Sequence, residues 1–257
     1  MTQDQFSLAG KKALVTGASR GIGQVIAVAF AQAGADVAIA ARSAHGLATT
    51  AQQVADLGRE AVEIPADLTT QQAAADVVTT AIERLGHLDV VVNNAGGSNF
   101  VVPFLDMRLS GWEKVLRLNL DATMWICQAA GAHMTARGGG SVINVASVAG
   151  LAAAPFLAPY GAAKAAVVSL TKTLASEWGR TGVRVNALCP GWTATELNRM
   201  LWETPDGGQA TIANVPMGRW AQPEEMGAPA VFLASDASSF MTGQVLAIDG
   251  GLTINAA

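Results

Sequence analysis

The chain has 257 residues, of which 51% are apolar and 14% are charged, and its formal net charge at pH 7 is −4. This length allows a full core and fits a single α/β domain over residues 1–257 better than two small domains. The acidic balance argues against a nucleic-acid partner, because basic residues form no run longer than Lys11 and Lys12.

The apolar residues are distributed as expected for a buried sheet. No uninterrupted apolar stretch reaches about 18 residues, and the N-terminus lacks the apolar centre of a signal peptide. We therefore expect a cytoplasmic protein without a membrane partner. No metal site is predicted, because the cysteines and histidines are scattered without the spacing of metal ligands. These residues are Cys127, Cys189, His45, His87 and His133.

The first motif is a short apolar run, Lys12–Thr16, that leads into a glycine-rich turn at residues 17–23. A helical pattern follows and is closed by Gly34. Strand, glycine turn and helix in this order predict the first half of a dinucleotide-binding βαβ unit, in which the backbone approaches a pyrophosphate. An ordinary loop is the alternative. The predicted cofactor contacts in this turn are Gly17, Ser19, Arg20, Gly21, Ile22 and Gly23.

The end of the second predicted strand, Asp36–Ala41, bears on which dinucleotide is bound. An acidic residue here would bind the ribose 2′-hydroxyl of NAD, but the strand ends in Ala41 and is followed by Arg42. Arg20 in the glycine turn lies within reach of the same pocket. Two guanidinium groups suit a 2′-phosphate, so NADP(H) is favoured over NAD(H), which stays possible. Both arginines could instead be solvated surface charges.

The middle of the chain alternates between strand and helix patterns. A third strand at Ala61–Pro65 precedes Asp67 and Leu68, which we expect to border the adenine ring. A helical pattern covers residues 70–85, and residues 88–92 form an apolar run typical of a parallel strand covered on both faces. That strand ends in a turn whose small and amide residues could line the cofactor cleft, namely Asn94, Ala95 and Gly96.

The candidate catalytic residues lie on the next three elements. Residues 109–134 predict a long helix whose apolar face is interrupted by Asn119, which would need polar partners if buried. A strand at residues 141–146 places Ser147 at the carboxyl edge of the sheet, where open α/β folds bind ligands. A helix over residues 160–178 carries Tyr160 and Lys164.

Tyr160 and Lys164 are four residues apart, so on a helix their side chains share one face. At about 4 Å and an effective dielectric of about 20, the lysine charge is worth roughly 4 kcal/mol. We therefore expect Lys164 to lower the pKa of Tyr160 towards neutrality, where general acid–base catalysis works best. Taken alone, the same spacing also occurs by chance on ordinary helices.

A sixth strand at residues 183–188 is followed by a segment that includes Pro190, Gly191, Thr193 and Thr195. From residue 196 to residue 215 the periodicity is lost although large apolar side chains persist. This pattern predicts a lid over the substrate, with a disordered insertion as the alternative. Residues 223–235 predict a helix and residues 244–248 a last strand.

Taken in order, these motifs closely resemble those of the classical short-chain dehydrogenase/reductase family. Within that family they are similar to the motifs of 3-oxoacyl-carrier-protein reductase-like members. The resemblance spans about residues 9–251 and rests on one set of positions. The set comprises Thr16, Gly17, Gly21, Gly23, Asn93, Asn94, Ala95, Gly96, Asn119, Ser147, Tyr160, Lys164, Pro190, Gly191 and the closing segment 241–251.

The resemblance implies an α/β, doubly wound Rossmann fold whose seven-stranded parallel sheet is flanked by helices. It also implies a homotetramer in which the helices at 109–134 and 160–178 build one interface. By position, Tyr160 would be the general acid and base, and Ser147 would hydrogen-bond the substrate oxygen. Lys164 would hold the nicotinamide ribose, and Asn119 would anchor a water that leads protons towards Lys164. The resemblance also implies that the nicotinamide end is bound by Pro190, Gly191, Thr193 and Thr195, and the adjacent ribose by residues 94–96.

We therefore predict an NADP(H)-dependent oxidoreductase that interconverts a small ketone or aldehyde and an alcohol. An NAD-dependent sugar, polyol or hydroxy-compound dehydrogenase is the nearest alternative, and a non-catalytic dinucleotide-binding regulator is the alternative from another class. The substrate itself is not predicted. The expected pocket wall comprises Ser98, Asn99, Phe100, Leu151, Phe156, Trp192 and the segment 196–215.

Overall fold

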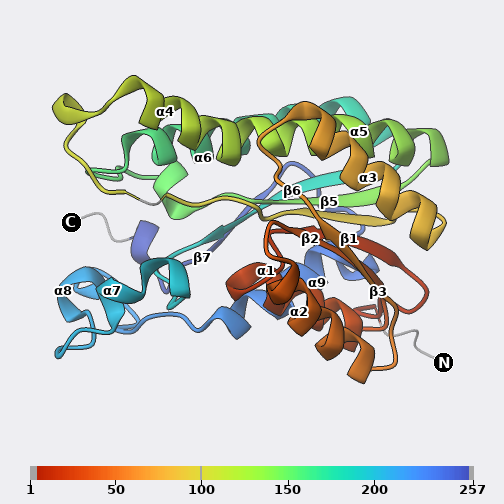
Figure 1. The fold of residues 1–257 in the computed structure, drawn as a ribbon, viewed down its shortest axis with the longest axis horizontal. Helices are drawn as coiled ribbons and strands as arrows, with labels where there is room; N and C mark the ends of the chain where they lie inside the picture. The colour runs from red at the N-terminus through yellow and green to blue at the C-terminus, as the bar shows by residue number, and fades with distance from the viewer. Residues whose placement is uncertain (1–4, 99, 255–257) are drawn as a thin grey trace.

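The computed structural model describes residues 5–98 and 100–254, so Asn99 of the expected pocket wall lies outside the described residues. Within these ranges, seven parallel strands form one sheet in the order β3-β2-β1-β4-β5-β6-β7 (Figure 1). The strands are β1 (Lys12–Thr16), β2 (Asp36–Ala41), β3 (Ala61–Pro65), β4 (Val90–Asn93), β5 (Gly140–Val145), β6 (Val183–Pro190) and β7 (Val245–Ile248). The strand order reverses between β1 and β4, which creates a crevice at their carboxyl ends.

Helices cover both faces of the sheet (Figure 1). One layer contains α1 (Gly21–Gln32), α2 (Ala44–Asp56) and α9 (Gly227–Ala234), and the other contains α3 (Gln71–Leu85), α4 (Leu109–Leu116), α5 (Ala122–Arg137) and α6 (Ala158–Trp178). Alternate residues of β1 enter different cores, since Ala13 and Val15 pack with α1 while Leu14 packs with α3 and α5. Burial on both faces explains why the strands read as continuous apolar runs.

Short helical segments connect these elements. They are η1 (Phe104–Asp106), the π-turn η2 (Arg117–Asp121), η3 (Val148–Gly150), η4 (Gly179–Thr181), η5 (Glu196–Asn198), α7 (Arg199–Trp202), α8 (Gln209–Ile212), η6 (Pro223–Met226), η7 (Asp236–Ser238) and η8 (Leu252–Ile254). No helix among the described residues is long and apolar enough to cross a bilayer.

The fold class predicted from the sequence is confirmed, whereas several element boundaries differ. The helix expected over residues 109–134 is divided by the π-turn into α4 and α5. The helix expected to start at Tyr160 starts at Ala158, because Pro159 fits the first turn, where its missing N–H costs no hydrogen bond. The last predicted helix begins as the 3₁₀ turn η6 before α9.

The segment expected to be irregular, residues 196–215, forms η5, α7 and α8. Ile212, Val215 and Trp220 are buried in a cluster of their own, against which Trp192 and Trp202 pack. The Trp192 and Trp220 rings meet edge to face with centroids 5.6 Å apart, and the Trp202 indole N–H donates to the Thr195 carbonyl at 2.9 Å. The segment is therefore built around its own apolar cluster, beside the main cores.

The loop after β5 lies directly on the backbone of α6, and a glycine permits this approach. A methyl group at Gly150 would lie 2.6 Å from the Lys164 carbonyl carbon and 2.7 Å from the Ala165 nitrogen. Helix backbone cannot move aside as the end of a flexible side chain can. The distance between Ser147 and α6 therefore depends on the missing side chain at Gly150.

We predict that Gly150→Ala lowers the free energy of unfolding by about 2 kcal/mol, because the added methyl group forces the loop away from α6. Urea denaturation measures the loss. Gly179→Ala is the matched control, since Gly179 has helical backbone angles and open space around its Cα. Equal stability of the two variants would show that the loop does not depend on this contact.

Candidate active site

The glycine turn after β1 lies against the segment that follows β4. Gly17 and Gly21 adopt φ angles of +66° and +59°, which favour glycine. A methyl group at Gly17 would lie 2.8 Å from Asn94 Nδ2 and 2.9 Å from Ala95 Cα. No side chain caps the first turn of α1, so its amide groups stay available at the carboxyl edge of the sheet. This cradle suits a pyrophosphate.

Thr16 and Asn94 hold the two sides of the crevice together. Thr16 Oγ1 donates to the Val92 carbonyl at 3.2 Å and accepts from the backbone N–H groups of Asn94 and Ala95 at 3.0 and 3.1 Å. In return, Asn94 Nδ2 donates to the carbonyls of Thr16 and Gly17 at 2.9 and 3.2 Å. The amide of Asn94 is thus used within the protein, which fixes the neighbouring backbone of Ala95 and Gly96.

The two arginines expected to recognise a 2′-phosphate are exposed and flank the end of β2. Among the described residues, neither Arg20 nor Arg42 has a hydrogen-bond or ion-pair partner. Ser43 caps α2 by accepting from the Gly46 N–H at 3.1 Å, and Ser19 packs against Gly46. The start of α2 therefore lies beside the glycine turn, with two free guanidinium groups close by in the sequence.

Of the two residues expected to border the adenine ring, Asp67 and Leu68, the first is exposed and the second is buried. Asp67 is exposed and accepts from the Thr69 N–H at 3.2 Å. Leu68 is only 4% exposed and belongs to the core between the sheet and α3. A contact of Leu68 with adenine would therefore have to use its main-chain atoms, because its side chain is part of the core.

Ser147, Tyr160 and Lys164 lie together at the carboxyl edge of β5. The Lys164 side chain is buried, and its Nζ donates to the Val145 carbonyl at 2.8 Å and lies 5.7 Å from the centroid of the Tyr160 ring. Ser147 accepts from the Ala149 N–H at 3.1 Å, and its hydroxyl also hydrogen-bonds to the phenol of Tyr160. A hydroxyl, a phenol and an ammonium thus share one site.

The expected lowering of the Tyr160 pKa is wrong for this arrangement. Burial raises the pKa of Tyr160 above its usual value, and the hydrogen bond from Ser147 offsets only part of this rise. Lys164 donates to a backbone carbonyl and has its own pKa lowered to about 8 by burial. The simple charge-pair argument omitted desolvation, which disfavours the charged form of both groups.

Asn119 lies in the π-turn between α4 and α5, and its side chain is fully hydrogen-bonded. Its Oδ1 accepts from the Gly97 N–H at 2.8 Å, and its Nδ2 donates to the carbonyls of Gly97 and Val115, each at 2.9 Å. A methyl group at Gly96 would lie 2.6 Å from Asn119 Oδ1 and 3.2 Å from Lys164 Nζ. The structure thus brings Asn119 to Lys164, separated by the bare backbone of Gly96.

The expected nicotinamide-binding segment starts at the end of β6. Gly191 donates its N–H to the Ile248 carbonyl at 3.0 Å and packs against Asp249. Thr193 is buried, and its hydroxyl donates to the Gly191 carbonyl at 3.2 Å. These contacts fix the backbone after Pro190 close to the edge of the sheet where Ser147 lies.

The segment that follows crosses the crevice. A Cβ atom added at Gly21 would lie 3.7 Å from the Thr195 methyl group. A Cβ atom added at Gly97 would lie 3.0 Å from Leu197 Cδ2. The segment therefore touches both the glycine turn and the backbone held by Asn119. Leu197 lies in the segment 196–215 that the sequence predicted as a lid and pocket wall, whereas its contact with Gly97 and the role of the Val145 carbonyl were not predicted.

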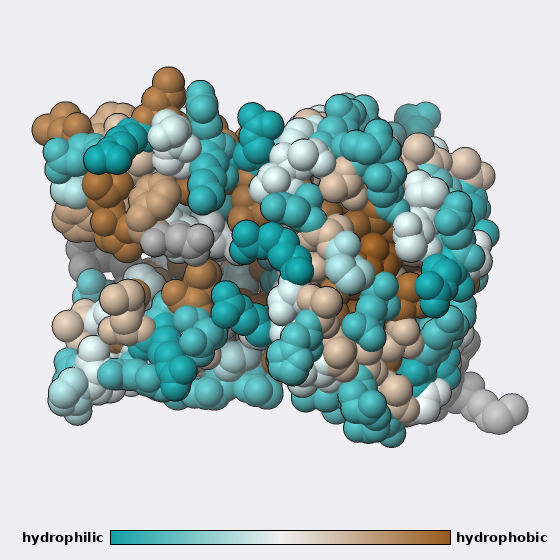
Figure 2. All heavy atoms as spheres, viewed as in Figure 1, coloured by the Kyte–Doolittle hydropathy of each residue, from teal (hydrophilic) through white to brown (hydrophobic). Residues whose placement is uncertain are grey.

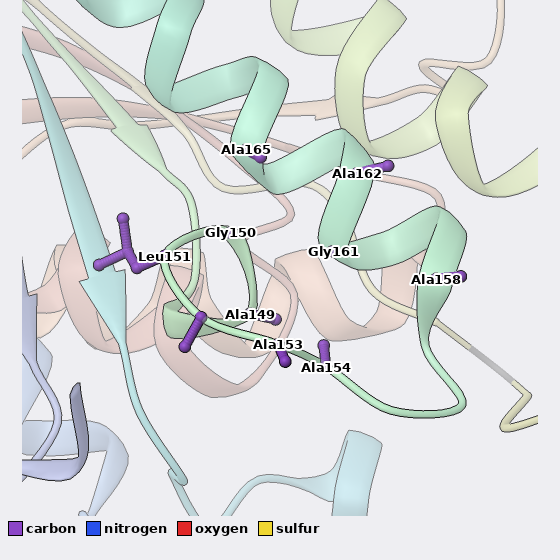
Figure 3. A pocket seen from close by; sticks show the side chains of 10 residues that line it. Ala149, Gly150, Leu151, Ala153, Ala154, Ala158, Gly161, Ala162 and Ala165 are labelled. Atoms are coloured by element: carbon purple, nitrogen blue, oxygen red, sulfur yellow. The ribbon is translucent and has the colours of Figure 1, made fainter. Parts of the chain in front are cut away.

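A shallow pocket of about 440 Å³ lies between the loop after Ser147 and α6 (Figure 3). Of the expected pocket wall, only Leu151 lines it. On α6 it is lined by small residues of the face opposite Tyr160 and Lys164, since positions two and five residues from Tyr160 point away on a helix. These residues are Ala158, Gly161, Ala162 and Ala165. The pocket is therefore separate from the catalytic group.

Apolar side chains are exposed around the start of α4, which Figure 2 shows on the same side of the molecule as α7 and α8, with a hollow between them. The exposed residues there are Val101, Phe104, Leu105 and Leu109. Phe156 is also exposed and adopts φ +66°, and its carbonyl accepts from the Val102 N–H at 3.0 Å. The loops on either side of the expected substrate cleft are thus joined by a backbone hydrogen bond.

Comparison with known proteins agrees with this geometry. The family described as Enoyl-(Acyl carrier protein) reductase matches residues 17–253. The chain is 42% identical over 253 residues to gluconate 5-dehydrogenase of Gluconobacter oxydans, covering 98% of each. It is also 42% identical over 255 residues to the 3-oxoacyl-acyl-carrier-protein reductase of rhamnolipid biosynthesis in Pseudomonas aeruginosa, covering 96% of this chain and 97% of that protein.

A solved gluconate 5-dehydrogenase of Burkholderia cenocepacia, in complex with NADP and tartrate, superimposes with a TM-score of 0.92. It is 39% identical to this chain, and the superposition covers 98% of both chains. The chain belongs to the short-chain dehydrogenase/reductase family. It is therefore an oxidoreductase of the hydride-transferring kind, and the family predicted from the motifs is confirmed.

The buried ammonium of Lys164 should destabilise the fold at neutral pH. Its pKa of about 8 lies below its ordinary 10.5, so the unfolded chain binds the proton more tightly between these values. This difference corresponds to about 3 kcal/mol, which is lost from stability below pH 8 and regained as pH rises to 10.5. The hydrogen bond to Val145 returns about 1 kcal/mol.

We predict that Lys164→Met is more stable than the wild type by about 2 kcal/mol at pH 7, and that this advantage disappears between pH 8 and 10.5. Urea denaturation over this pH range measures the difference. Lys172→Met on the same helix is the control, because Lys172 is exposed. A pH-independent difference between the two variants would contradict the buried charge.

Proposed function

We propose that the chain is an NADP(H)-dependent oxidoreductase that interconverts a small ketone or aldehyde and the corresponding alcohol. The observation that carries this proposal is the group formed by Ser147, Tyr160 and Lys164 at the carboxyl edge of the sheet. A phenol held beside a hydroxyl and an ammonium can move a proton at a reacting oxygen. The Burkholderia relative that acts on gluconate supports a hydroxylated small molecule as one class of substrate.

The residues around the crevice fit a dinucleotide. The first turn of α1 has no side-chain cap, so its backbone N–H groups are available to a pyrophosphate. Gly17 and Gly96 let the neighbouring segments approach closely, Gly17 against Asn94 and Gly96 between Asn119 and Lys164, which shapes the crevice beside that turn. When bound, NADP(H) supplies or accepts the hydride. The proposed contacts are those predicted from the sequence, from Gly17 to Thr195, with main-chain atoms serving at Leu68 and at Asn94.

Tyr160 donates its proton to the carbonyl oxygen during reduction and removes the hydroxyl proton during oxidation. Ser147 donates a hydrogen bond to the same oxygen as negative charge develops there. Protonated Lys164 faces the ribose and stabilises the tyrosinate that forms when Tyr160 gives up its proton. Because burial raises the pKa of Tyr160, this charge is needed for the phenol to act near neutral pH.

We propose that Asn119 contributes to proton supply through its main-chain carbonyl, which would hold a water molecule. All three hydrogen-bonding groups of its carboxamide are used by Gly97 and Val115. Its main-chain carbonyl accepts a long bond, 3.4 Å, from the Thr123 hydroxyl. A water held by this carbonyl would lie on the same turn that places Asn119 next to Lys164.

We also propose a homotetramer. The small residues on the outer face of α6 and the exposed Met124 of α5 support an interface between subunits, which sedimentation velocity would test.

Two further proposals are a mobile lid at residues 196–215 and a cytoplasmic location. Contact of Leu197 with Gly97 supports the lid, because opening must break it. Tryptophan fluorescence on adding NADPH would report its movement, and cell fractionation would test the location.

We predict that Tyr160→Phe lowers kcat by at least about 100-fold while the Kd for NADPH changes by less than about threefold. The reason is that phenylalanine keeps the ring and loses only the group that transfers the proton. A panel of ketones, polyols and sugar acids followed by NADPH absorbance measures kcat, and fluorescence titration measures Kd. Tyr160 is the single tyrosine of the chain, so loss of tyrosinate absorbance verifies the variant. Retained turnover in Tyr160→Phe would contradict the mechanism. If the wild type binds NADPH but turns over no substrate of the panel, the non-catalytic regulator is favoured instead.

We predict that Arg42→Ala lowers kcat/KM for NADPH by about 10- to 100-fold and changes the value for NADH by less than about threefold. A charge-assisted hydrogen bond to the 2′-phosphate is worth about 1.5–3 kcal/mol, and NADH lacks this group. Arg84→Ala is the control, because Arg84 is an exposed residue at the end of α3. If NADH is the better cofactor and Arg42→Ala has no effect, the NAD-dependent alternative is correct.

A further inference from the structure

A chain of buried hydrogen bonds passes beneath the candidate active site and links four elements. Asn93 Nδ2 of β4 donates to Cys127 Sγ of α5 at 3.2 Å and to Asn144 Oδ1 of β5 at 2.8 Å. Asn144 Nδ2 then donates to Thr171 Oγ1 of α6 at 2.9 Å. Each of these four residues is at most 3% exposed, and none of them belongs to the proposed catalytic group.

The chain attaches α6 to β5 beside the bond made by the catalytic lysine. Val145 accepts the Lys164 ammonium at 2.8 Å, and the preceding residue, Asn144, donates to Thr171. Thr171 follows Tyr160 by eleven residues and Lys164 by seven, so all three side chains lie within about 40° on the helix surface. Two adjacent residues of one strand therefore hold the same face of α6 at points two turns apart.

The direction of the bond from Asn144 to Thr171 follows from the other bonds that these two residues make. The Thr171 hydroxyl donates to the Val167 carbonyl of its own helix at 2.8 Å, which leaves a lone pair for Asn144. The Asn144 carboxamide accepts from Asn93 on one side and donates to Thr171 on the other. Rotating the Asn144 amide alone would place its NH2 group against the NH2 group of Asn93, so the bond between these two residues would be lost. The bond therefore specifies one rotation of α6 about its axis.

We propose that Asn144 and Thr171 are positioning residues that set the rotation of α6 and so aim Tyr160 and Lys164 into the crevice. This inference rests on the proposed function, because it needs Tyr160 to transfer the proton. Neither residue contacts the reacting atoms. Without the Thr171 hydroxyl, the buried Asn144 amide lacks an acceptor, and α6 turns or shifts until one is found. A displacement of about 1 Å at the reacting group can cost about 100-fold in rate.

The test compares Thr171→Val, which keeps the shape and removes the hydroxyl, with Thr171→Ser, which restores it. We expect Thr171→Val to lower kcat by about 10- to 100-fold with KM within about threefold, and Thr171→Ser to recover most of this loss. Thr173→Val is the matched control, because the exposed Thr173 hydroxyl also donates to its own helix, to the Ser169 carbonyl at 3.2 Å.

A readout independent of turnover comes from the single tyrosine of the chain. Its tyrosinate absorbance reports the pKa of Tyr160 directly, and this pKa depends on the distances to Ser147 and Lys164. We expect the titration midpoint to move in Thr171→Val, to return in Thr171→Ser and to stay unchanged in Thr173→Val. A merely structural role would lower the denaturation midpoint without moving this titration.

The inference is overturned if folded Thr171→Val keeps the wild-type kcat and tyrosine titration, or if Thr171→Ser is no better than Thr171→Val. If the valine variant does not fold, Thr171→Cys replaces it, and wild-type kinetics with this weaker acceptor overturn the inference equally. Retained turnover in Tyr160→Phe would instead overturn the proposed function. Loss of turnover in Tyr160→Phe with normal Thr171→Val kinetics would remove only the positioning role.

Discussion

A lysine whose side chain is almost wholly removed from water must find acceptors inside the protein or lose its proton. Lys164 donates to the Val145 carbonyl at 2.8 Å, yet its pKa still falls to about 8 because one carbonyl does not replace the lost hydration. The position of this ammonium depends on the carbonyl of Val145, the last residue of β5, and on Gly96 lacking a side chain. The rest of the site is arranged around this buried charge.

Close approach of backbones is the second constraint, and it recurs on both sides of the crevice. Gly17 touches the Asn94 segment, Gly96 lies between Asn119 and Lys164, and Gly150 lies on α6. In each case a single added carbon would meet polar or backbone atoms that are already held by hydrogen bonds. The glycines therefore serve packing as well as turn geometry, and they bring segments far apart in sequence to one edge of the sheet.

The polar side chains beneath the site stabilise the protein structure, whereas those within the site are available to a ligand. Asn94, Asn119 and Asn144 each use their amide groups on protein partners, so they order the backbone and the helices. Ser147 and Tyr160 retain exposed surface, so they stay available to a ligand. This division explains how a largely apolar protein can hold a few reactive groups at fixed positions without exposing the supporting network.

The sequence by itself determined the alternation of strands and helices, the glycine turn and the shared face of Tyr160 and Lys164. These features depend on local geometry, namely residue periodicity and the backbone freedom of glycine, which are written in neighbouring positions. The family followed from the order of such motifs. The sequence also indicated that Asn119 needs hydrogen-bond partners if it is buried, although not which residues they are.

Only the tertiary structure decided the π-turn at Asn119, the contact of Leu197 with Gly97 and the direction of the Tyr160 pKa shift. Within this π-turn, Asn119 bonds to Gly97, which lies 22 residues earlier in the chain, so its partner is known only once the chain has folded. The pKa depends on how much water the surrounding elements remove, and a charge argument from spacing alone cannot include that. Desolvation and hydrogen-bond partners are properties of packed elements, so they exist only once the chain has folded.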